Sequence, residues 1–340
     1  MKRLICALLC VSLLLAGCAG TGEPEQKQYT ASYLTLFDTV TYITGRAESK
    51  EAFIRTAQGI HDELQVYHRL FDIYNDYEGN NLKTVNDNAG VAPVTVDRAI
   101  IELLLDCRSY YEATEGRVNV AMGSVLKLWH EARNDGLDDP ANAYLPDAQT
   151  LAEAAAHMDF DCVVIDEAAS TVFLTDPALR LDVGAVAKGW SVQRVCETAP
   201  KGLLISVGGN VCATGPKDEA GTPWVVGVQD PDGGSEYLHT LYASGGSIVT
   251  SGDYQRAYMV GGTVYHHIID PDTLYPSKYW RSVTVVCDDS GLADALSTAL
   301  FLLPQEEGQA LLDKFGARAM WVDAEGTIFY SPGFESLIRT

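Results

Sequence analysis

Residues 181–190 have the sequence Leu-Asp-Val-Gly-Ala-Val-Ala-Lys-Gly-Trp, which places an acid, a cation and two glycines among apolar residues. This mixture is too polar for a plain core strand. The glycines permit close backbone approach and unusual φ values, and a lysine where such a loop opens a helix can neutralise phosphate. The match to a phosphate loop is loose, so the segment predicts either an anion site or a tight strand-to-helix turn with a surface lysine.

The N-terminus has the features of an export signal: Met-Lys-Arg, an apolar run over residues 4–15, and a small-residue cleavage site. That run is too short to remain as a membrane-spanning helix. The four residues ending at Cys18 resemble the lipobox of bacterial lipoproteins. We therefore predict a signal peptide over 1–17, a lipidated Cys18, a flexible tether over 18–32 and a single domain over 33–340. The protein would be lipid-anchored on the extracytoplasmic face of a bacterial cell membrane.

Composition excludes some function classes. The formal net charge is −22, and removal of the predicted signal, which carries Lys2 and Arg3 and no acid, makes it −24. Nucleic acid is therefore not an expected partner, since it requires a basic surface. The five cysteines after Cys18 are odd in number and contain no Cys-x-x-Cys, which predicts buried thiols rather than a disulfide framework or a zinc site.

Hydrophobic periodicity predicts helices interleaved with strands. The expected helices cover 51–70, 97–115 and 292–303, and the expected strands cover 37–43, 203–207, 224–228, 264–269 and 283–286. Residues 134–148 carry Asp, Asn, Gly and Pro and predict a long connection. The strands between turn signals look partly paired as hairpins, which favours an α+β fold with mixed, largely antiparallel sheets and flanking helices.

Two polar groups stand out in the C-terminal half. Asp294 and Thr298 are four residues apart on a predicted helix, so a carboxylate and a hydroxyl share one face. Oxygen ligands of this kind suit Mg²⁺, which takes few protein ligands, although a buried acid and threonine with no ligand is the commoner outcome for such a pair. Residues 265–273, Tyr-His-His-Ile-Ile-Asp-Pro-Asp-Thr, bring two histidines to a Pro-bounded turn.

Together with Thr-Ser-Gly-Asp-Tyr at 250–254, Gly-Gly-Asn at 208–210 and Ala-Asp-Ala-Leu-Ser-Thr at 293–298, these motifs resemble the ApbE family of FAD:protein FMN transferases, from about residue 37 to the end. The resemblance implies a single ApbE-type (T-fold-like) domain. It also implies a Mg²⁺-dependent enzyme that cleaves FAD, attaches FMN to a Thr or Ser hydroxyl of a partner protein and releases AMP. The implied partner is an acceptor flavoprotein subunit of a membrane electron-transport complex.

The resemblance also implies roles for single residues. His267 matches the catalytic histidine, the metal-binding positions match Ala185, Asp294 and Thr298, and the FAD-contacting positions match Tyr74, Ala121, Asp182, Lys188, Gly208 and Gly209. Two motifs depart from the family pattern: Leu274 stands where a glycine is common, and Asn119-Val120-Ala121 replaces a usual Asp-x-Thr.

The residues by themselves leave two other functions open. The protein could be a lipid-anchored carrier that holds FAD without chemistry, or a Mg²⁺-dependent pyrophosphatase that gives FMN and AMP. The adjacent His266 and His267 near a metal site argue against the carrier. Serine hydrolase and nicotinamide chemistry are unsupported, because neither Gly-x-Ser-x-Gly nor a Gly-x-Gly-x-x-Gly following a strand occurs.

Overall fold

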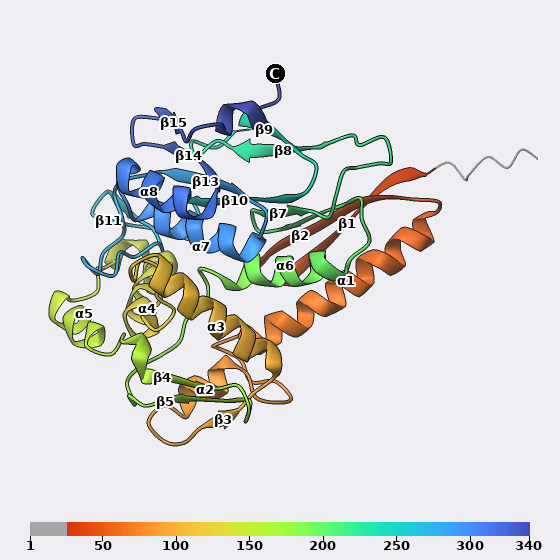
Figure 1. Cartoon of the computed structure of the whole chain (residues 1–340). Coiled ribbons are helices and arrows are strands. Elements are labelled where there is room, and N and C mark those ends of the chain that lie inside the picture. Colours follow the sequence, from red (N-terminus) through yellow and green to blue (C-terminus); the bar gives the residue numbers. More distant parts are fainter. Residues whose placement is uncertain (1–25, 235) are drawn as a thin grey trace, which may run out of the picture.

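The structure is a computed structural model that describes residues 26–234 and 236–340 (Figure 1). The predicted signal peptide, Cys18 and the tether up to residue 25 lie outside these residues. Helices flank sheets whose named strand pairs are all antiparallel, so the α+β prediction is confirmed. Within the described ranges, no helix is both long and apolar enough to cross a bilayer.

An eight-stranded sheet forms the centre of the molecule (Figure 1). Across the sheet the strands are β1 (Lys27–Leu36), β2 (Thr39–Ala47), β6 (Leu203–Val207), β7 (Asn210–Ala213), β10 (Gly246–Gly252), β13 (Ser282–Cys287), β14 (Arg318–Val322) and β15 (Ile328–Tyr330). Strands distant in the chain become neighbours in this order. Tyr42 of β2, for example, pairs with Ser206 of β6.

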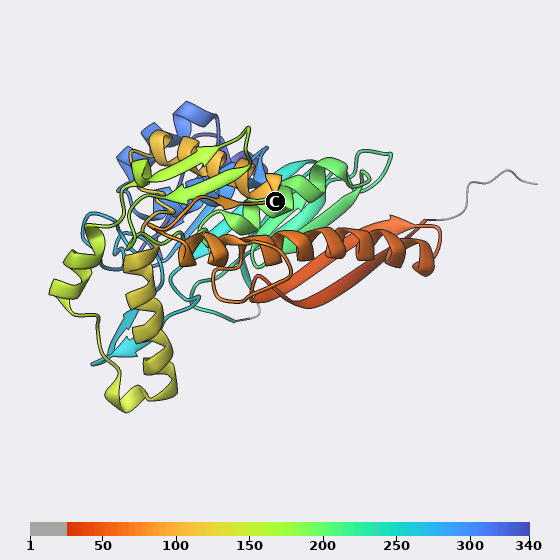
Figure 2. The same ribbon diagram turned by 90° about the horizontal axis from the view of Figure 1, so that it is seen from below.

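Four helices pack on this sheet or on one another: α1 (Lys50–Phe71), α6 (Ala187–Thr198), α7 (Ser290–Phe301) and α8 (Gln305–Phe315). Figure 2 shows α1 lying along the hairpin of β1 and β2. Ser49 caps α1 by accepting a hydrogen bond from the amide of Ala52, and the apolar face of the helix includes Phe53, Ile60 and Leu64. Burial of each such side chain stabilises the fold by about 1.5–3 kcal/mol.

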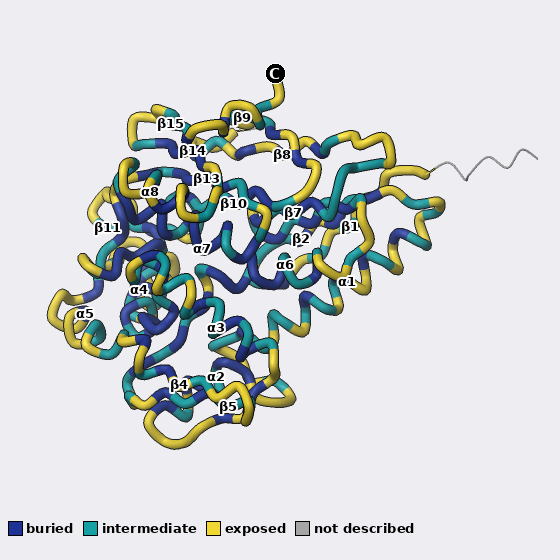
Figure 3. The backbone as a smooth tube through the Cα atoms, in the orientation of Figure 1, coloured by how far each residue is buried: buried dark blue, intermediate teal, exposed yellow. Residues whose placement is uncertain are grey.

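Helix α7 is the most enclosed of these helices, as the dark tube in Figure 3 shows. Leu296 and Leu300 share a core cluster with Val283 and Val285 of β13. The opposite face of the sheet is covered by a hairpin of β8 (Trp224–Gln229) and β9 (Tyr237–Ala243). Helix α7 therefore carries its polar residues into the interior of the protein, where they need partners.

The remaining elements form smaller units beside the sheet. They are α2 (Leu82–Asp87), α3 (Arg98–Ala113), α4 (Gly123–Asp138), α5 (Ala148–Ala155), the sheet of β3 (Val94–Thr95), β5 (Thr171–Leu174) and β4 (Val163–Asp166), and the hairpin of β11 (Tyr258–Val260) and β12 (Thr263–Tyr265). The predicted helices over 51–70, 97–115 and 292–303 agree with α1, α3 and α7 to within a few residues.

The predicted tether is wrong from Lys27 onward, because β1 begins there. The segment is polar on the outer face of the hairpin, but alternate residues turn toward α1. The ring of Tyr29 stacks on Phe53 and the ring of Tyr33 stacks on His61. A period of two within a polar composition is a strand signal that the tether interpretation overlooked.

The strand expected over 37–43 begins only at Thr39, because Phe37 and Asp38 form a turn with positive φ. Two other boundaries also differ. Helix α4 continues through residues 134–138, expected to be loop, because Gly136 packs against the ring of Tyr258. The strand expected over 264–269 ends at Tyr265. The chain turns there because the amide of Ile268 donates to Nδ1 of His266 at 3.2 Å. In both places tertiary or local side-chain contacts override composition and alternation.

Candidate active site

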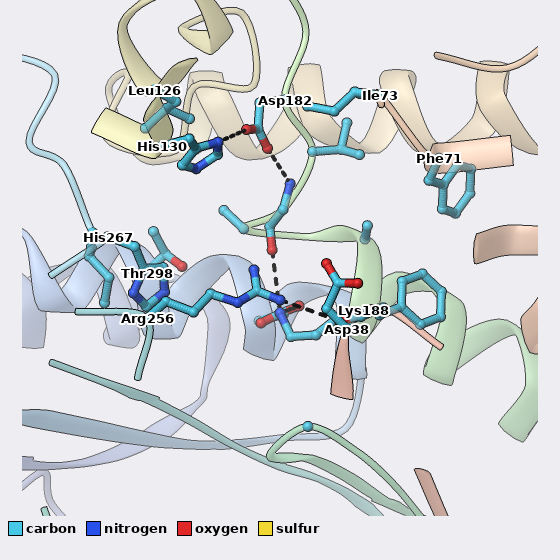
Figure 4. Close-up of a pocket in the computed structure, with 18 of the residues that line it drawn as sticks. Asp38, Phe71, Ile73, Leu126, His130, Asp182, Lys188, Arg256, His267 and Thr298 are labelled. Atoms are coloured by element: carbon cyan, nitrogen blue, oxygen red, sulfur yellow. Dashed lines mark hydrogen bonds and ion pairs between the residues drawn. The ribbon is translucent and has the colours of Figure 1, made fainter. Parts of the chain in front are cut away.

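A cavity of about 520 Å³ lies where the β1–β2 turn, the N-terminus of α6 and the inner face of α7 meet (Figure 4). Its lining comes from segments spread over the whole described chain: residues 37–39, 68–75, 117–130, 182–188, 251–256, 267–269 and 294–302 all contribute side chains. A cavity of this size suits a ligand as large as a cofactor.

The loop of residues 182–188 forms one wall. Oδ1 of Asp182 accepts a hydrogen bond from the amide of Gly184 at 2.9 Å, which fixes a tight turn. Nζ of Lys188 donates to the carbonyl of Gly184 at 3.3 Å, so its ammonium group is held against the loop. Helix α6 begins at Ala187, and its N-cap residue, Val186, supplies no side-chain hydrogen bond.

Asp294 supplies the missing cap from another helix. Its Oδ2 accepts hydrogen bonds from the amide of Gly189 and from Nδ2 of Asn210, both at 2.8 Å, and lies 3.6 Å from Nζ of Lys188. Asp294 is only 4% exposed. A carboxylate at a helix N-terminus is favoured by the unpaired amides and by the helix dipole, so these contacts hold the buried charge in place.

Only a glycine allows this contact. A Cβ built on Gly189 would lie 2.3 Å from the carbonyl oxygen of Ser290 and 2.4 Å from Cβ of Asp294. The predicted role of the glycines in close backbone approach is therefore found at Gly189. The same holds at Gly208, which has φ +53° and whose Cβ would lie 2.6 Å from Oγ1 of Thr39.

The other carboxylate oxygen of Asp294 is available to a ligand. Within the part of the chain that the structure describes, no donor bonds Oδ1 of Asp294, and the residue lines the cavity together with Thr298 and Ala185. The described ranges contain no cluster of three or more His, Cys, Asp or Glu side chains suited to a metal ion. A cation here would therefore depend on one carboxylate, a hydroxyl, backbone carbonyls and oxygens of the ligand, which is a set of the kind that Mg²⁺ uses.

His267 faces the cavity with a fixed tautomer. Its Nδ1–H donates to the carbonyl of Gln255 at 3.0 Å, which leaves Nε2 as the acceptor. Burial, followed by the nearby Arg256, lowers the pKa of His267 to about 3, so the ring is neutral at pH 7. His266 has a different role, because Nε2–H bonds the carbonyl of Ser277 at 2.8 Å and Nδ1 accepts from Ile268.

Three polar side chains are connected at the rim of the cavity. The hydroxyl of Tyr74 lies 2.8 Å from Nδ1 of His130. That nitrogen lies 3.9 Å from Oδ2 of Asp182, as Figure 4 shows. Burial lowers the pKa of His130, which the carboxylate of Asp182 opposes. Tyr74 is 63% exposed, so one face of its ring is available to a planar ligand.

The structure brings together most of the residues that the sequence singled out. Those that line the cavity are Tyr74, Asp182, Ala185, Lys188, Gly208, His267, Asp294 and Thr298. Ala121 does not, because it is completely buried in the core, and its neighbours Asn119 and Met122 line the cavity instead. Gly209 lies outside the lining as well.

The two departures from the family pattern have local explanations. Leu274 adopts φ +63°, the left-handed conformation that glycine favours, so the turn is kept at some cost in strain. Its carbonyl accepts a hydrogen bond from Nε1 of Trp129. Asn119 bonds the amide of Ala121 through Oδ1 and the carbonyl of Met158 through Nδ2.

Sequence reasoning missed several cavity residues. Arg256, His130, Phe37 and Asp38 all line it. Arg256 follows the motif at 250–254 by two residues, and that proximity could have drawn attention to it. No local pattern marks His130, whose place depends on the packing of α4.

The chain is similar to known proteins over most of its length. The ApbE family matches residues 35–321. An FAD:protein FMN transferase of Treponema pallidum is 31% identical, over 98% of this chain and 94% of that protein. Another from Klebsiella pneumoniae is 32% identical over 74% of this chain and 79% of that protein. A crystal structure of the ApbE protein of Thermotoga maritima superposes with a TM-score of 0.81 at 28% identity, covering 92% of this chain and all of that one.

Proposed function

The chain belongs to the ApbE family, and on this premise we propose that it is an FAD:protein FMN transferase that moves FMN from FAD to a Thr or Ser hydroxyl of a partner protein and releases AMP. The observation that carries the proposal is the single cavity shared by Lys188, Asp294 and His267. It puts a cation, an anchored carboxylate and a neutral imidazole within one volume, and these are the groups that phosphoryl transfer needs.

The reaction exchanges one phosphorus–oxygen bond for another. The bond between the FMN phosphorus and the bridging oxygen of the diphosphate breaks, and a bond from that phosphorus to the acceptor Oγ forms. The hydroxyl proton passes to Nε2 of His267, which is unprotonated at neutral pH and held by Gln255. The AMP phosphate leaves with the electron pair, and the ammonium group of Lys188 offsets part of its charge.

A bound dinucleotide would also improve the base. The pKa of His267 is low in part because the cations Arg256 and Lys188 face it. A diphosphate placed among these groups adds negative charge, and nearby negative charge raises the pKa of a histidine. His267 would then become a stronger proton acceptor when the substrate is present.

Mg²⁺ is part of the proposal. Oδ1 of Asp294, the hydroxyl of Thr298 and the carbonyl of Ala185 would hold it. Two donors bond Oδ2 of Asp294, whereas no donor in the described part of the chain bonds Oδ1, and this supports the assignment. Once bound, the ion would neutralise charge on the diphosphate oxygens.

We further propose that Cys18 anchors the enzyme by lipid to the extracytoplasmic face of a bacterial membrane. The supporting observations are the basic start, the apolar run and the small residues before Cys18. The acceptor would be a flavoprotein subunit of a membrane electron-transport complex. An anchored enzyme would meet such a subunit in the same membrane.

The test is a transfer assay with the full chain in detergent, FAD, Mg²⁺ and an acceptor protein carrying a flavinylation-site threonine. A fluorescent acceptor band on a denaturing gel, with one AMP released per flavin attached, is expected. Free FMN and AMP without a band would instead indicate a pyrophosphatase, and intact FAD would indicate a carrier.

Single substitutions test which side chains take part in the transfer. His267→Ala should lower transfer by about 10²–10⁴-fold while FAD still binds. His239→Ala is the matched control, because His239 bonds Tyr330 and lies outside the cavity lining. Asp294→Ala should abolish the response to Mg²⁺. Transfer at the unaltered rate in His267→Ala would reject the assigned base.

A further inference from the structure

Several residues with strained backbone conformations line the active-site cavity. Seven non-glycine residues of the described ranges have clearly positive φ, and three of them line the active-site cavity: Phe37 at +53°, Asp38 at +55° and Arg256 at +48°. Such conformations are disfavoured for residues with a Cβ, and they persist where surrounding contacts impose them, often at functional sites.

Phe37 and Asp38 form the two-residue turn between β1 and β2. Leu36 pairs with Thr39 across it, so both central residues must have positive φ, as in a type I′ turn. Such turns usually contain Asn-Gly or Asp-Gly, and this one contains neither glycine nor asparagine. The amide of Phe37 donates to Nδ1 of His68 at 3.3 Å, which helps to hold the turn over the cavity.

Arg256 reaches this turn from the opposite side. Its Nη2 donates to the carbonyl of Phe37 at 3.3 Å, which links two strained positions that are far apart in the chain. In Figure 4 its side chain points from the His267 side of the cavity toward Lys188 and Asp38. The guanidinium group is therefore positioned by backbone contacts, and most of its donors are left for another partner.

The charge of Arg256 has no partner within the described residues. No carboxylate there lies within 4.0 Å of its nitrogens, whereas Lys188 lies 3.6 Å from Asp294. Arg256 and Lys188 both face His267 closely enough to disfavour its protonation. Arg256 and Lys188 thus converge on one volume. The carboxylates that line it are Asp294, which is paired with Lys188, and Asp38, Asp72 and Asp182. The third lining cation, Arg117, is already paired with Asp270 and Asp272.

We propose that Arg256 binds the diphosphate of the flavin dinucleotide, with its planar guanidinium donating to phosphate oxygens opposite Lys188. This inference rests on the proposed function. A guanidinium suits the task because its donors match two phosphate oxygens at once and its charge does not titrate. The hydrogen bond from Arg256 to the carbonyl of Phe37 holds the side chain at the cavity before the ligand arrives.

The rival explanation is that Arg256 only supports the β1–β2 turn. The two roles differ in what they do to ligands with and without phosphate. Arg256→Gln retains a donor for the carbonyl of Phe37 and removes the charge. If the turn alone mattered, riboflavin and FAD would lose affinity together. If the diphosphate is the partner, only phosphate-bearing ligands lose it.

The experiment measures binding of FAD, ADP and riboflavin to the full chain by calorimetry and flavin fluorescence. We expect Arg256→Gln to weaken FAD and ADP by about 10- to 100-fold, the usual effect of losing a hydrogen bond from a charged group. Riboflavin should change by less than about twofold, and Arg256→Lys should recover part of the ADP affinity.

Arg133→Gln is the matched control. Arg133 lies close enough to Arg256 for their charges to oppose one another, but it does not line the main cavity. Within the described ranges its side chain forms hydrogen bonds only with Asn134. Its substitution should leave ADP affinity nearly unchanged. Unaltered ADP binding in Arg256→Gln, or an equal loss for riboflavin, would overturn the inference. A wild-type chain that binds ADP through Arg256 but transfers no FMN would refute the proposed function alone.

Discussion

Gly189→Ala tests the contact on which the site is built. The added Cβ would lie 2.3 Å from the carbonyl oxygen of Ser290 and 2.4 Å from Cβ of Asp294. The first neighbour is backbone and the second is fixed to it, so α6 and α7 must separate. Separation stretches the 2.8 Å hydrogen bond from the amide of Gly189 to Oδ2 of Asp294.

The magnitude follows from two costs that are alternatives. Keeping the helices together costs about 1–3 kcal/mol of overpacking, and moving them apart loses a charge-assisted hydrogen bond of about 1.5–3 kcal/mol. Alanine gains about 1 kcal/mol of helix propensity over glycine. We therefore expect Gly189→Ala to lower the free energy of unfolding by up to about 2 kcal/mol.

The chain offers a matched control in Gly59, which lies inside α1 and where an added methyl group would meet nothing within 4 Å beyond the chain neighbours and backbone of its own helix. Gly59→Ala should raise the free energy of unfolding by about 0.5–1 kcal/mol. Urea unfolding of both variants gives the comparison, and FMN transfer should fall about 10²-fold in Gly189→Ala alone, because Asp294 is displaced. Equal stabilisation by both alanines would refute the close contact of α6 with α7.

Three further predictions concern single side chains. Burial lowers the pKa of His267 to about 3, below the value of about 6.5 in the unfolded chain. The unfolded state therefore binds a proton that the folded state does not, and the free energy of unfolding should fall as pH drops from about 6.5 toward 3. Urea unfolding should show a less steep fall in His267→Gln. Asn210→Ala removes a donor to Asp294 and should destabilise the fold by about 1–3 kcal/mol and raise the Mg²⁺ concentration needed for half-maximal transfer; an unchanged Mg²⁺ titration would contradict this. Tyr74→Phe should bind FAD within about twofold of the parent chain, whereas Tyr74→Ala, which removes the ring, should bind about tenfold more weakly in fluorescence titrations.

Much of the site could be predicted from the sequence because its motifs are short and local. Residues 181–190 contain both the loop and the start of α6. Asp294 and Thr298 lie on one face of α7 because they are four residues apart. The polar character of both stretches within apolar surroundings was the signal.

The rest depends on tertiary packing. Ala121 was predicted to touch the ligand, but a residue beside a cavity and a residue in the wall behind it have the same local sequence. The structure puts Ala121 in the wall. The sequence does not show which of His266 and His267 faces the cavity. Their roles differ because His266 bonds the carbonyl of Ser277 and His267 bonds the carbonyl of Gln255. The position of Arg256 depends on its hydrogen bond to the carbonyl of Phe37, a residue more than half the chain away.

The order of strands in the central sheet affects how the protein is made. The β1–β2 hairpin leaves the ribosome early, yet its sheet neighbour β6 follows only after α1 to α6 have been synthesised. Until then β2 has an open edge, which is prone to wrong pairing. Long-range pairing of this kind slows folding. The cavity also needs residues of α7, so a nascent chain that ends before α7 lacks part of the lining.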